Sequence, residues 1–398
     1  MIERAGTDAA EARFAPLEGV RVLDLTRVLA GPYATMLLGD LGADVVKVER
    51  PMVGDETRSV VTYPGRASHD EDYFYVANRN KRSIALDLKD EAGLATAREL
   101  ATVADVVVEN FRPGVVQRLG LDVGSVRETN PKVIYCSVSG FGQTGPRRVR
   151  PSYDGIIQAM SGLMSLTGDP DGPPTRAGIM IADLSGGLLA VVAIMAALEE
   201  RRRTGRGSHI DVALLESLVG MLGVHAAEYL ATGRVPGRTG SSNPNRAPAG
   251  AFRTADGRYV QLMASTDHLW EALCAALEAG WLTADPRFAT QQDRLTNRGA
   301  LDAALQEIFL SMDADEVTGR LDRAGVPCAP VLDVGQALTQ EQVVVRGLVR
   351  EVDHPMSGGI RQIGFPALFD GKRPEVDRPP PVLDQDRADV VRDWLGEP

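Results

Sequence analysis

The side chain with the clearest chemical potential is the carboxylate of Asp183. It follows Ile179, Met180, Ile181 and Ala182, and it precedes Leu184, Ser185, two glycines and an apolar run at 188–198. This order predicts a helix that opens with an aspartate, where unpaired backbone N–H groups and the helix dipole favour the anionic form. Two interpretations stay open: an ordinary N-cap, or an exposed nucleophile that forms covalent acyl intermediates. Gly186 and Gly187 lack a Cβ, so we expect them to leave room for a bulky ligand beside the backbone.

Basic residues form a second candidate site. The segment 78–82 is a local basic cluster, and Arg50, Lys89, Arg112 and Arg118 stand at or near the ends of predicted strands. A single charge run is most often solvated surface. Several at one edge of a sheet instead indicate a polyanion site, because Arg and Lys bind phosphate through charge-assisted hydrogen bonds.

Other motifs exclude common chemistries. The segment 140–145 matches G-x-G-x-x-G, but Pro146, Arg147 and Arg148 follow it instead of a helix, so NAD binding is not expected. The five histidines show no metal-ligand spacing, and no G-x-S-x-G elbow occurs. We therefore expect neither a metal site nor a serine hydrolase.

Composition narrows the class of protein. The 398 residues, 44% hydrophobic, suffice for two domains with separate cores, and the net charge of −11 gives no general case for binding nucleic acid or an anionic membrane. The longest purely apolar run, 188–198, is too short to span a bilayer. Three widely spaced cysteines (Cys136, Cys274 and Cys328) and an N-terminus unlike a signal peptide predict a cytoplasmic protein.

The elements that must position these residues alternate along the chain. Strand patterns at 20–25, 44–49, 83–87, 105–109, 132–138 and 209–212 are separated by helical patterns. Later helices are expected at 153–167, 184–203 and 214–230, and an exposed one at 384–395. This alternation predicts an α/β fold with a parallel sheet that is covered on both faces, and ligands of such sheets bind outside the carboxyl ends of the strands.

A change in composition predicts a second domain. The Gly- and Pro-rich stretch 233–248 precedes a hairpin signal at 251–263 and several helical patterns. We expect a large domain at 17–232, a smaller inserted α+β domain at 233–325, and a return segment at 326–398 that completes the large domain.

Seven motifs in this order resemble the class III CoA-transferase (CaiB/BaiF) family. They are 17–24 (LEGVRVLD), 30–32 (AGP), 38–49 (LGDLGADVVKVE), 80–83 (NKRS), 108–114 (VENFRPG), 140–146 (GFGQTGP) and the stretch around Asp183. The resemblance implies a Rossmann-like large domain, a small inserted domain and a homodimer whose chains interlock like links. It also implies that Asp183 is the nucleophile, that coenzyme A or acyl-CoA is a substrate, and that no cofactor is tightly bound.

The resemblance further implies which residues contact CoA. They are Val28, Leu29 and Ala30 near the pantetheine, Arg50, Leu86, Asp87, Leu88 and Lys89 near the nucleotide, and Asn110, Phe111, Arg112, Arg118, Val138, Ser139, Gly140 and Phe141.

Departures from the motifs bear on the substrate. Family members that transfer CoA between formate and oxalate carry a glutamine at the position of Leu29 and a lysine at that of Ser139, and racemases carry a histidine at that of Tyr153. The region 153–178 looks most like members that move CoA from succinyl-CoA to another dicarboxylic acid. Arg176 is then a candidate clamp for a distal carboxylate, and equally an ordinary surface arginine.

The expected reaction passes through an aspartyl anhydride and an aspartyl-CoA thioester on Asp183, with Gly186, Gly187 and the loop 241–250 as candidate oxyanion donors. An acyl-CoA racemase or epimerase and a non-catalytic acyl-CoA binding protein remain the alternatives.

Overall fold

The computed structural model describes residues 14–60 and 72–396, which form two compact units. The first unit consists of the described parts of Met1–Leu163, Ala177–Ala227 and Gln342–Pro398, and the second of Met164–Arg176 and Glu228–Glu341. Each unit buries its own hydrophobic cluster. The units are therefore described separately.

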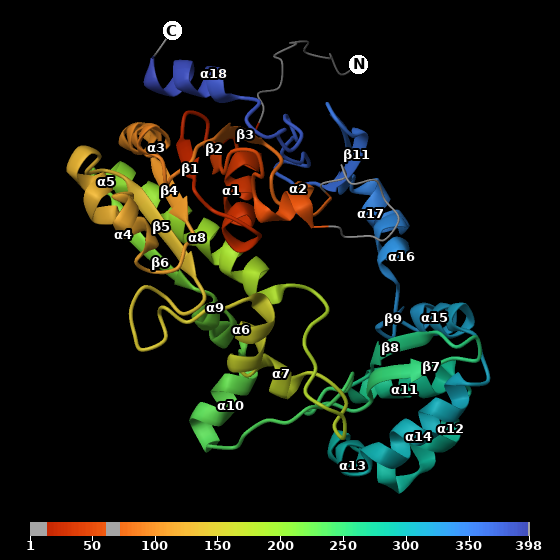
Figure 1. Ribbon diagram of the computed structural model, residues 1–398. Helices are drawn as coiled ribbons and strands as arrows, with labels where there is room; N and C mark the ends of the chain where they lie inside the picture. Colours follow the sequence, from red (N-terminus) through yellow and green to blue (C-terminus); the bar gives the residue numbers. More distant parts are fainter. Residues whose placement is uncertain (1–13, 61–71, 397–398) are drawn as a thin grey trace, which may run out of the picture. The chain divides into compact units, whose positions relative to one another are not determined.

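A six-stranded parallel sheet is the centre of the first unit (Figure 1). Its order is β3-β2-β1-β4-β5-β6, with the bounds β1 (Arg21–Asp24), β2 (Asp44–Glu49), β3 (Lys81–Ala85), β4 (Val106–Glu109), β5 (Ile134–Ser139) and β6 (Ser208–Ala213). Every neighbouring pair in this sheet is parallel. The predicted α/β class with a parallel sheet is confirmed.

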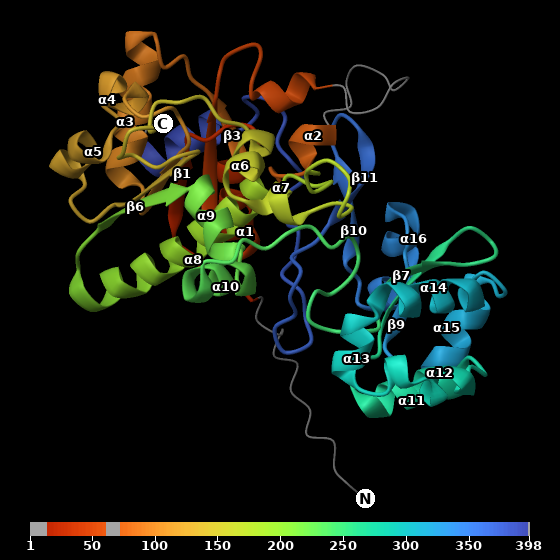
Figure 2. The same ribbon diagram turned by 90° about the horizontal axis from the view of Figure 1, so that it is seen from below.

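Helices cover both faces of this sheet. Both faces must be covered because strands such as β4 (VVVE) carry apolar side chains on both sides. On one face, strand residues Val22 and Val108 pack with Ala34 of α1 (Ala30–Asp40) and Ile194 of α8 (Ile181–Thr204). On the other face, Val107 joins the cluster that holds α3 (Glu91–Val103) and α5 (Val123–Thr129). Figure 2 shows α9 (Leu214–Met221) beside α8.

The remaining elements of the first unit are shorter. They are η1 (Glu56–Ser59), α2 (Asp72–Tyr75), α4 (Val115–Leu119), α6 (Asp154–Met160), β10 (Val349–His354), β11 (Gly358–Ile363), α18 (Arg387–Val390) and the π-helical turn η3 (Val391–Leu395). Strands β10 and β11 form an antiparallel hairpin. Three helices cross the sequence limits of the two units: α7 (Leu163–Leu166), α10 (Val224–Thr232) and α17 (Glu341–Val345).

The helix α8 is long and apolar enough to cross a membrane when judged by length and composition alone. Its residues Ala182, Ala190 and Ile194 are buried in the cluster between α1 and the sheet. Core helices of globular proteins pass the same test of composition, so we treat α8 as the central core helix of this unit.

The second unit has a three-stranded antiparallel sheet of β7 (Ala249–Arg253), β8 (Tyr259–Met263) and β9 (Cys328–Pro330). The expected hairpin at 251–263 is confirmed, with β7 paired to β8. The helices of this unit are α11 (Asp267–Ala276), α12 (Gly280–Ala284), η2 (Pro286–Phe288), α13 (Gln291–Thr296), α14 (Arg298–Phe309), α15 (Ala314–Arg323) and α16 (Val334–Thr339). Phe252, Trp270 and Phe309 contribute to its core.

Two predicted helices are broken at glycines. The expected helix at 153–167 is divided into α6 and α7, and the expected helix at 214–230 into α9 and α10, which meet at 79°. Gly162 and Gly223 stand at the breaks with φ values of +92° and +52°. Such backbone conformations are open to glycine and end a right-handed helix.

The segment 384–395, expected to be an exposed helix, is exposed on one face only, with Arg387, Asp389 and Arg392 in solvent. Val390 and Trp394 are buried with Leu100 of α3, and the indole Nε1 of Trp394 donates to Asp44 at 2.7 Å. Arg82 pairs with Asp393 at 3.0 Å. This segment therefore completes one face of the sheet.

Candidate active site

The carboxyl edge of the parallel sheet collects the residues that the resemblance assigned to CoA. Residues 28–30 follow β1, Arg50 follows β2, residues 86–89 follow β3, and residues 110–112 follow β4. Residues 138–141 lie at the end of β5, and Arg118 lies in α4. Because parallel strands end at the same edge, segments far apart in sequence converge there.

Four cations at this edge are exposed: Arg50, Lys89, Arg112 and Arg118. Arg50 lies 3.8 Å from Glu56, which is too long for a hydrogen bond. The side chains of the other three have no ion-pair partner within residues 14–60 and 72–396. They are therefore free to meet phosphate groups.

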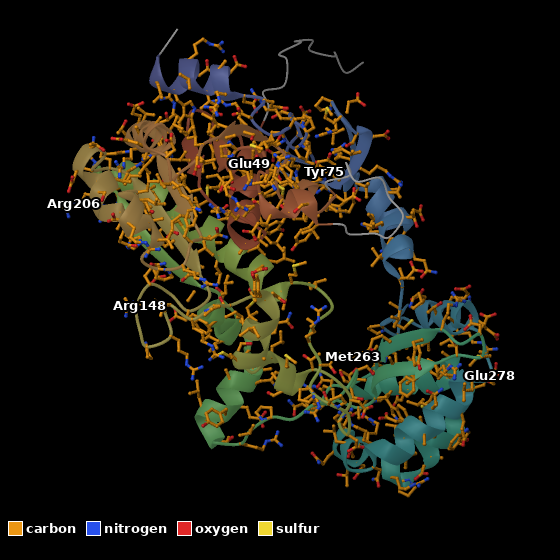
Figure 3. The ribbon with its side chains drawn as sticks, in the orientation of Figure 1. Glu49, Tyr75, Arg148, Arg206, Met263 and Glu278 are labelled. Carbon is orange, nitrogen blue, oxygen red and sulfur yellow. The ribbon has the colours of Figure 1, made fainter. Side chains whose placement is uncertain are left out.

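Unlike these exposed cations, the cations of the basic cluster 78–82 are buried and paired. Arg79 makes two hydrogen bonds to Asp40, at 3.0 and 2.6 Å, and Lys81 lies 2.9 Å from Asp24. Arg82 is bound to Asp44. The interpretation of this cluster as a phosphate site is therefore wrong, since its cations are paired with Asp40 of α1, Asp24 of β1 and Asp44 of β2. Glu49 of β2, labelled in Figure 3, is likewise buried and paired, with Arg58.

Asn110 and Phe111 bind the loop that follows β1. The amide of Asn110 accepts from the backbone N–H of Arg27 at 2.8 Å and donates to its carbonyl at 2.7 Å. The guanidinium of Arg27 lies 4.8 Å from the centre of the Phe111 ring. The amide of Asn110 is thus engaged with protein backbone.

Two buried polar atoms near this edge lack a partner in the described chain: the Oγ of Ser139 and the Oε1 of Glu109. Burial, with a smaller contribution from Asp211, raises the pKa of Glu109 to about 7. Buried polar groups are normally hydrogen-bonded, so unpaired ones at a strand end are the type that a ligand would satisfy.

Asp183 lies at the start of α8, the helix that packs against α1. It is the third residue of the helix, and Met180 occupies the N-cap position without a side-chain hydrogen bond. Of the two interpretations left open by the sequence, the ordinary N-cap is therefore wrong. Its carboxylate has no hydrogen bond or ion pair with any part of the chain that the structure describes.

The capping role falls to Asp154, the first residue of α6. Its Oδ1 accepts from the N–H of Ala182 at 2.8 Å, and its Oδ2 accepts from the Nε2 of Gln158 at 2.6 Å. The Oε1 of Gln158 accepts from the N–H of Ala177 at 2.8 Å. The two side chains fix the segment that leads into α8, and their spacing of one helical turn was the only signal for them in the sequence.

The environment of Asp183 opposes its ionisation. Burial, followed by the nearby charge of Asp154, raises the pKa of Asp183 to about 7. Burial and the charge of Asp183 in turn raise the pKa of Tyr73. The hydroxyl of Tyr73 donates to the thioether of Met180 at 3.0 Å, a weak acceptor. Sequence reasoning missed Tyr73, because nothing near it in the chain points to Asp183.

Gly186 and Gly187 are buried and do not provide the expected room. A Cβ on Gly186 would lie 2.2 Å from the side chain of Leu214, and one on Gly187 would lie 2.7 Å from the carbonyl of Ala30. Both belong to the second turn of α8, where helical N–H groups are already bonded. These glycines let α9 and α1 approach α8 closely, so the expectation that a ligand uses this space is wrong.

Two further predicted features belong to the second unit. Arg176 is exposed there, and its guanidinium has no ion-pair partner among the residues described. In the loop 241–250, the hydroxyl of Ser241 accepts from the N–H of Ala251 at 2.9 Å.

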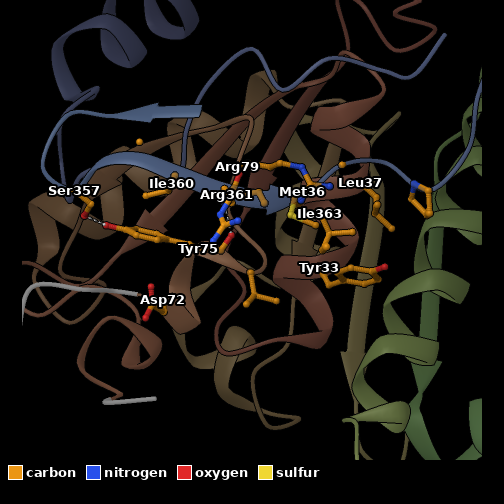
Figure 4. Close-up of a pocket in the computed structure, with 15 residues that line it drawn as sticks. Tyr33, Met36, Leu37, Asp72, Tyr75, Arg79, Ser357, Ile360, Arg361 and Ile363 are labelled. Atoms are coloured by element: carbon orange, nitrogen blue, oxygen red, sulfur yellow. Dashed lines mark hydrogen bonds between the residues drawn. The ribbon is translucent and has the colours of Figure 1, made fainter. Parts of the chain in front are cut away.

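A cavity of about 730 Å³ lies within the first unit between α1, α2 and β11 (Figure 4). Tyr33, Tyr75, Arg79 and Arg361 are among its lining residues, and none of the residues that the resemblance assigned to catalysis, CoA or substrate is. Among residues 14–60 and 72–396, no group of three His, Cys, Asp or Glu side chains is placed to hold a metal ion.

Comparison with known proteins gives the family. The pattern described as CoA-transferase family III matches residues 17–387. The chain is 42% identical to the acetyl-CoA:oxalate CoA-transferase of Acetobacter aceti, over 96% of each chain. It is 42% identical to the succinyl-CoA:glutarate CoA-transferase of Mus musculus, over 96% of this chain and 86% of that protein.

A solved structure agrees with these relatives. The crystal structure of a CaiB/BaiF family protein from Brucella suis superposes with a TM-score of 0.87 and 39% identity, over 96% of this chain and 100% of that one. The chain belongs to CoA-transferase family III and is a CoA-transferase. The resemblance that rested on seven short motifs is confirmed.

The raised pKa of Asp183 predicts how stability depends on pH. A carboxyl group that ionises less readily in the folded state destabilises that state as pH rises from about 4 to above 7. Asp183→Asn removes this cost, so the variant should be more stable than the wild type at pH 8, by at most about 4 kcal/mol, and the difference should shrink towards pH 4. Urea unfolding at several pH values measures it.

The matched control is Asp353→Asn, at an exposed aspartate of β10. It should leave the free energy of unfolding nearly unchanged across the same range. An Asp183→Asn protein no more stable than the wild type at pH 8 would contradict the desolvated carboxylate.

Proposed function

We propose that this enzyme transfers CoA from succinyl-CoA to a second dicarboxylic acid, with Asp183 as the nucleophile. The observation that carries the proposal is the unpartnered, partly buried carboxylate at the start of the core helix α8. An ordinary structural aspartate at a helix start would bond to backbone N–H groups, and here Asp154 does so instead.

The proposed reaction proceeds by two exchanges at the Asp183 carboxyl group. A carboxylate oxygen attacks the carbonyl carbon of the donor thioester, the C–S bond breaks, and a mixed anhydride and CoA thiolate form. The thiolate then attacks the aspartyl carbonyl, which releases the donor acid and leaves an aspartyl-CoA thioester. The acceptor carboxylate reverses both steps and regenerates Asp183. Each intermediate keeps the energy of the thioester, provided that water is excluded.

We propose that CoA binds along the carboxyl edge of the sheet through the residues that the resemblance assigned. The exposed Arg50, Lys89, Arg112 and Arg118 support this proposal, because they concentrate positive charge on a protein with a net charge of −11. The unpaired hydroxyl of Ser139 supports it at the end of β5. Coenzyme A is a substrate in this proposal, with no tightly bound cofactor.

The choice of succinyl-CoA rests on the relatives and on two positions. Relatives named for succinyl-CoA or succinate with glutarate or mesaconate are 38 to 42% identical to this chain. Leu29 and Ser139 replace the glutamine and lysine expected for formate and oxalate. The relative named for acetyl-CoA and oxalate makes acetyl-CoA the competing donor. Arg176 is the proposed clamp for a distal carboxylate.

We further propose a cytoplasmic homodimer with interlocked chains, in which residues 233–325 form a small inserted domain. Large apolar side chains exposed on a single chain support an extensive contact with a second copy: Leu188 and Val192 on α8, Val219 on α9 and Val224 on α10. The free cysteines Cys136, Cys274 and Cys328 are consistent with a reducing compartment.

Asp183→Asn tests the nucleophile. Because amide nitrogen and oxygen cannot form the anhydride, transfer should fall by about 10⁴-fold or more, while the Kd for CoA should change little. Wild-type protein incubated with donor should carry a CoA adduct, detected by intact mass and removed by hydroxylamine. Asp353→Asn should retain wild-type activity. Substantial turnover by Asp183→Asn would remove Asp183 from this role.

A panel of acids tests the substrate. Succinyl-CoA and acetyl-CoA are each offered with oxalate, glutarate, mesaconate and a monocarboxylic acid, and new thioesters are read by mass. We expect succinyl-CoA with a dicarboxylate to give the highest kcat/KM, and Arg176→Lys to lower it about tenfold or more, because lysine cannot form two parallel bonds. Deuterium entering the α-carbon of an acyl-CoA without CoA exchange would indicate a racemase, and binding without exchange a non-catalytic protein.

Subunit exchange tests the interlocked dimer. Two preparations with chains of different mass, mixed in the native state, should form no hybrid dimer, because linked chains separate only on unfolding. Unfolding and refolding the mixture should give hybrids in the statistical proportion, visible by native mass measurement. Hybrids that form on native mixing would show a dimer without linkage.

A further inference from the structure

The loop between β1 and α1 has an unusual backbone. Val28 has a φ of +67°, in the left-handed region. Valine is branched at Cβ, and such residues are rare outliers in this region, at a cost of roughly 1–3 kcal/mol. Something in the surroundings must hold the peptide there.

Three side chains, from β2 and from the loops that follow β2 and β4, hold this loop residue by residue. Lys47 of β2 donates to the carbonyl of Thr26 at 2.8 Å, and Asn110, after β4, bonds both backbone groups of Arg27. The N–H of Val28 donates to the carboxylate of Asp55, at 3.3 and 3.2 Å from its two oxygens. The strained Val28 is therefore held by the anionic carboxylate of Asp55.

Asp55 is itself fixed. Its carboxylate lies 3.0 Å from the Nζ of Lys47, and both side chains are fully buried. It also accepts from the N–H and Oγ of Thr57, at 3.0 and 2.9 Å, while its own N–H donates to Glu49 at 2.9 Å. Burial alone would raise its pKa, but Lys47 and Thr57 outweigh burial and hold the pKa of Asp55 below its usual range.

The β1–α1 loop leads directly into a helix start at which a ligand could bind. Val28, Leu29 and Ala30 lead into α1, whose N-cap, Leu29, has no side-chain bond to the helix. Backbone N–H groups at such a start remain available for a ligand. A loop already held in its binding conformation avoids an ordering cost when the ligand arrives.

We propose that Asp55, oriented by Lys47, is a positioning residue that holds Val28 in the left-handed conformation, so that the β1–α1 loop is preformed for the pantetheine arm of an acyl-CoA. The proposal rests on the proposed function for the identity of the ligand. The buried pair acts on binding by fixing geometry, since buried ion pairs add little net stability.

A double-mutant cycle tests this role, with the Kd for CoA measured by calorimetry. Asp55→Asn should weaken binding about tenfold, as expected for loss of a hydrogen bond to a charged group. Val28→Gly removes the steric objection to a positive φ, so in that background Asp55→Asn should weaken binding less than about threefold. Equal effects of Asp55→Asn in both backgrounds would show a general structural role and overturn the proposal.

The matched control is Asp40→Asn, which breaks the buried pair with Arg79 away from the loop. It should lower the Tm as Asp55→Asn does and leave the Kd unchanged. If it weakened CoA binding equally, the positioning role would be refuted.

Hydrogen exchange of the wild-type protein tests the proposal without any variant, so the result does not depend on whether Asp55→Asn folds. The amide of Val28 should be protected without CoA and gain little protection on CoA binding. Protection that appears only with CoA would overturn the proposal. If the wild-type protein transfers CoA but these tests fail, the proposed function stands and the positioning role of Asp55 does not. If the wild-type protein binds no CoA, the proposed function and the positioning role both fail.

Discussion

Charged side chains of β1, β2 and β3 are buried and must be paired, and this requirement restricts the loops at the carboxyl edge of the sheet. Lys81 is paired with Asp24, Lys47 with Asp55, and Arg58 with Glu49, each within 3.0 Å. A lost partner would leave an uncompensated charge in the interior. The loops that leave these strands therefore have little freedom, which suits an edge that must meet a long, flexible thioester in one orientation.

The start of α8 is arranged on a different principle. At the start of α8, Asp154 accepts the backbone hydrogen bond that an aspartate there would normally accept, and Asp183 has no partner among the residues that the structure describes. The helix start is therefore satisfied without the carboxyl group of Asp183, which stays available for the proposed reaction. A group that is costly to ionise is a common property of catalytic positions, where stability is given up for activity.

The sequence was sufficient for features that depend on neighbours along the chain. Apolar runs such as 106–109 identified the parallel strands, and seven motifs identified the family. It was insufficient where the outcome depends on distant partners. The cluster 78–82 reads as a surface charge run, because Asp24, Asp40 and Asp44 are remote in sequence. The environment of Asp183 likewise depends on Asp154 and Tyr73, which only the fold brings close.

The segment that carries Trp394 has a consequence for how the protein is made. Trp394 binds Asp44 across 350 positions of sequence, and with Val390 it closes one face of the sheet. During translation, β2 emerges long before this covering segment exists, so that face stays open to water or to chaperones for most of synthesis. Contacts of such long range also slow the final step of folding, because the chain must close a large loop before it gains their stabilisation.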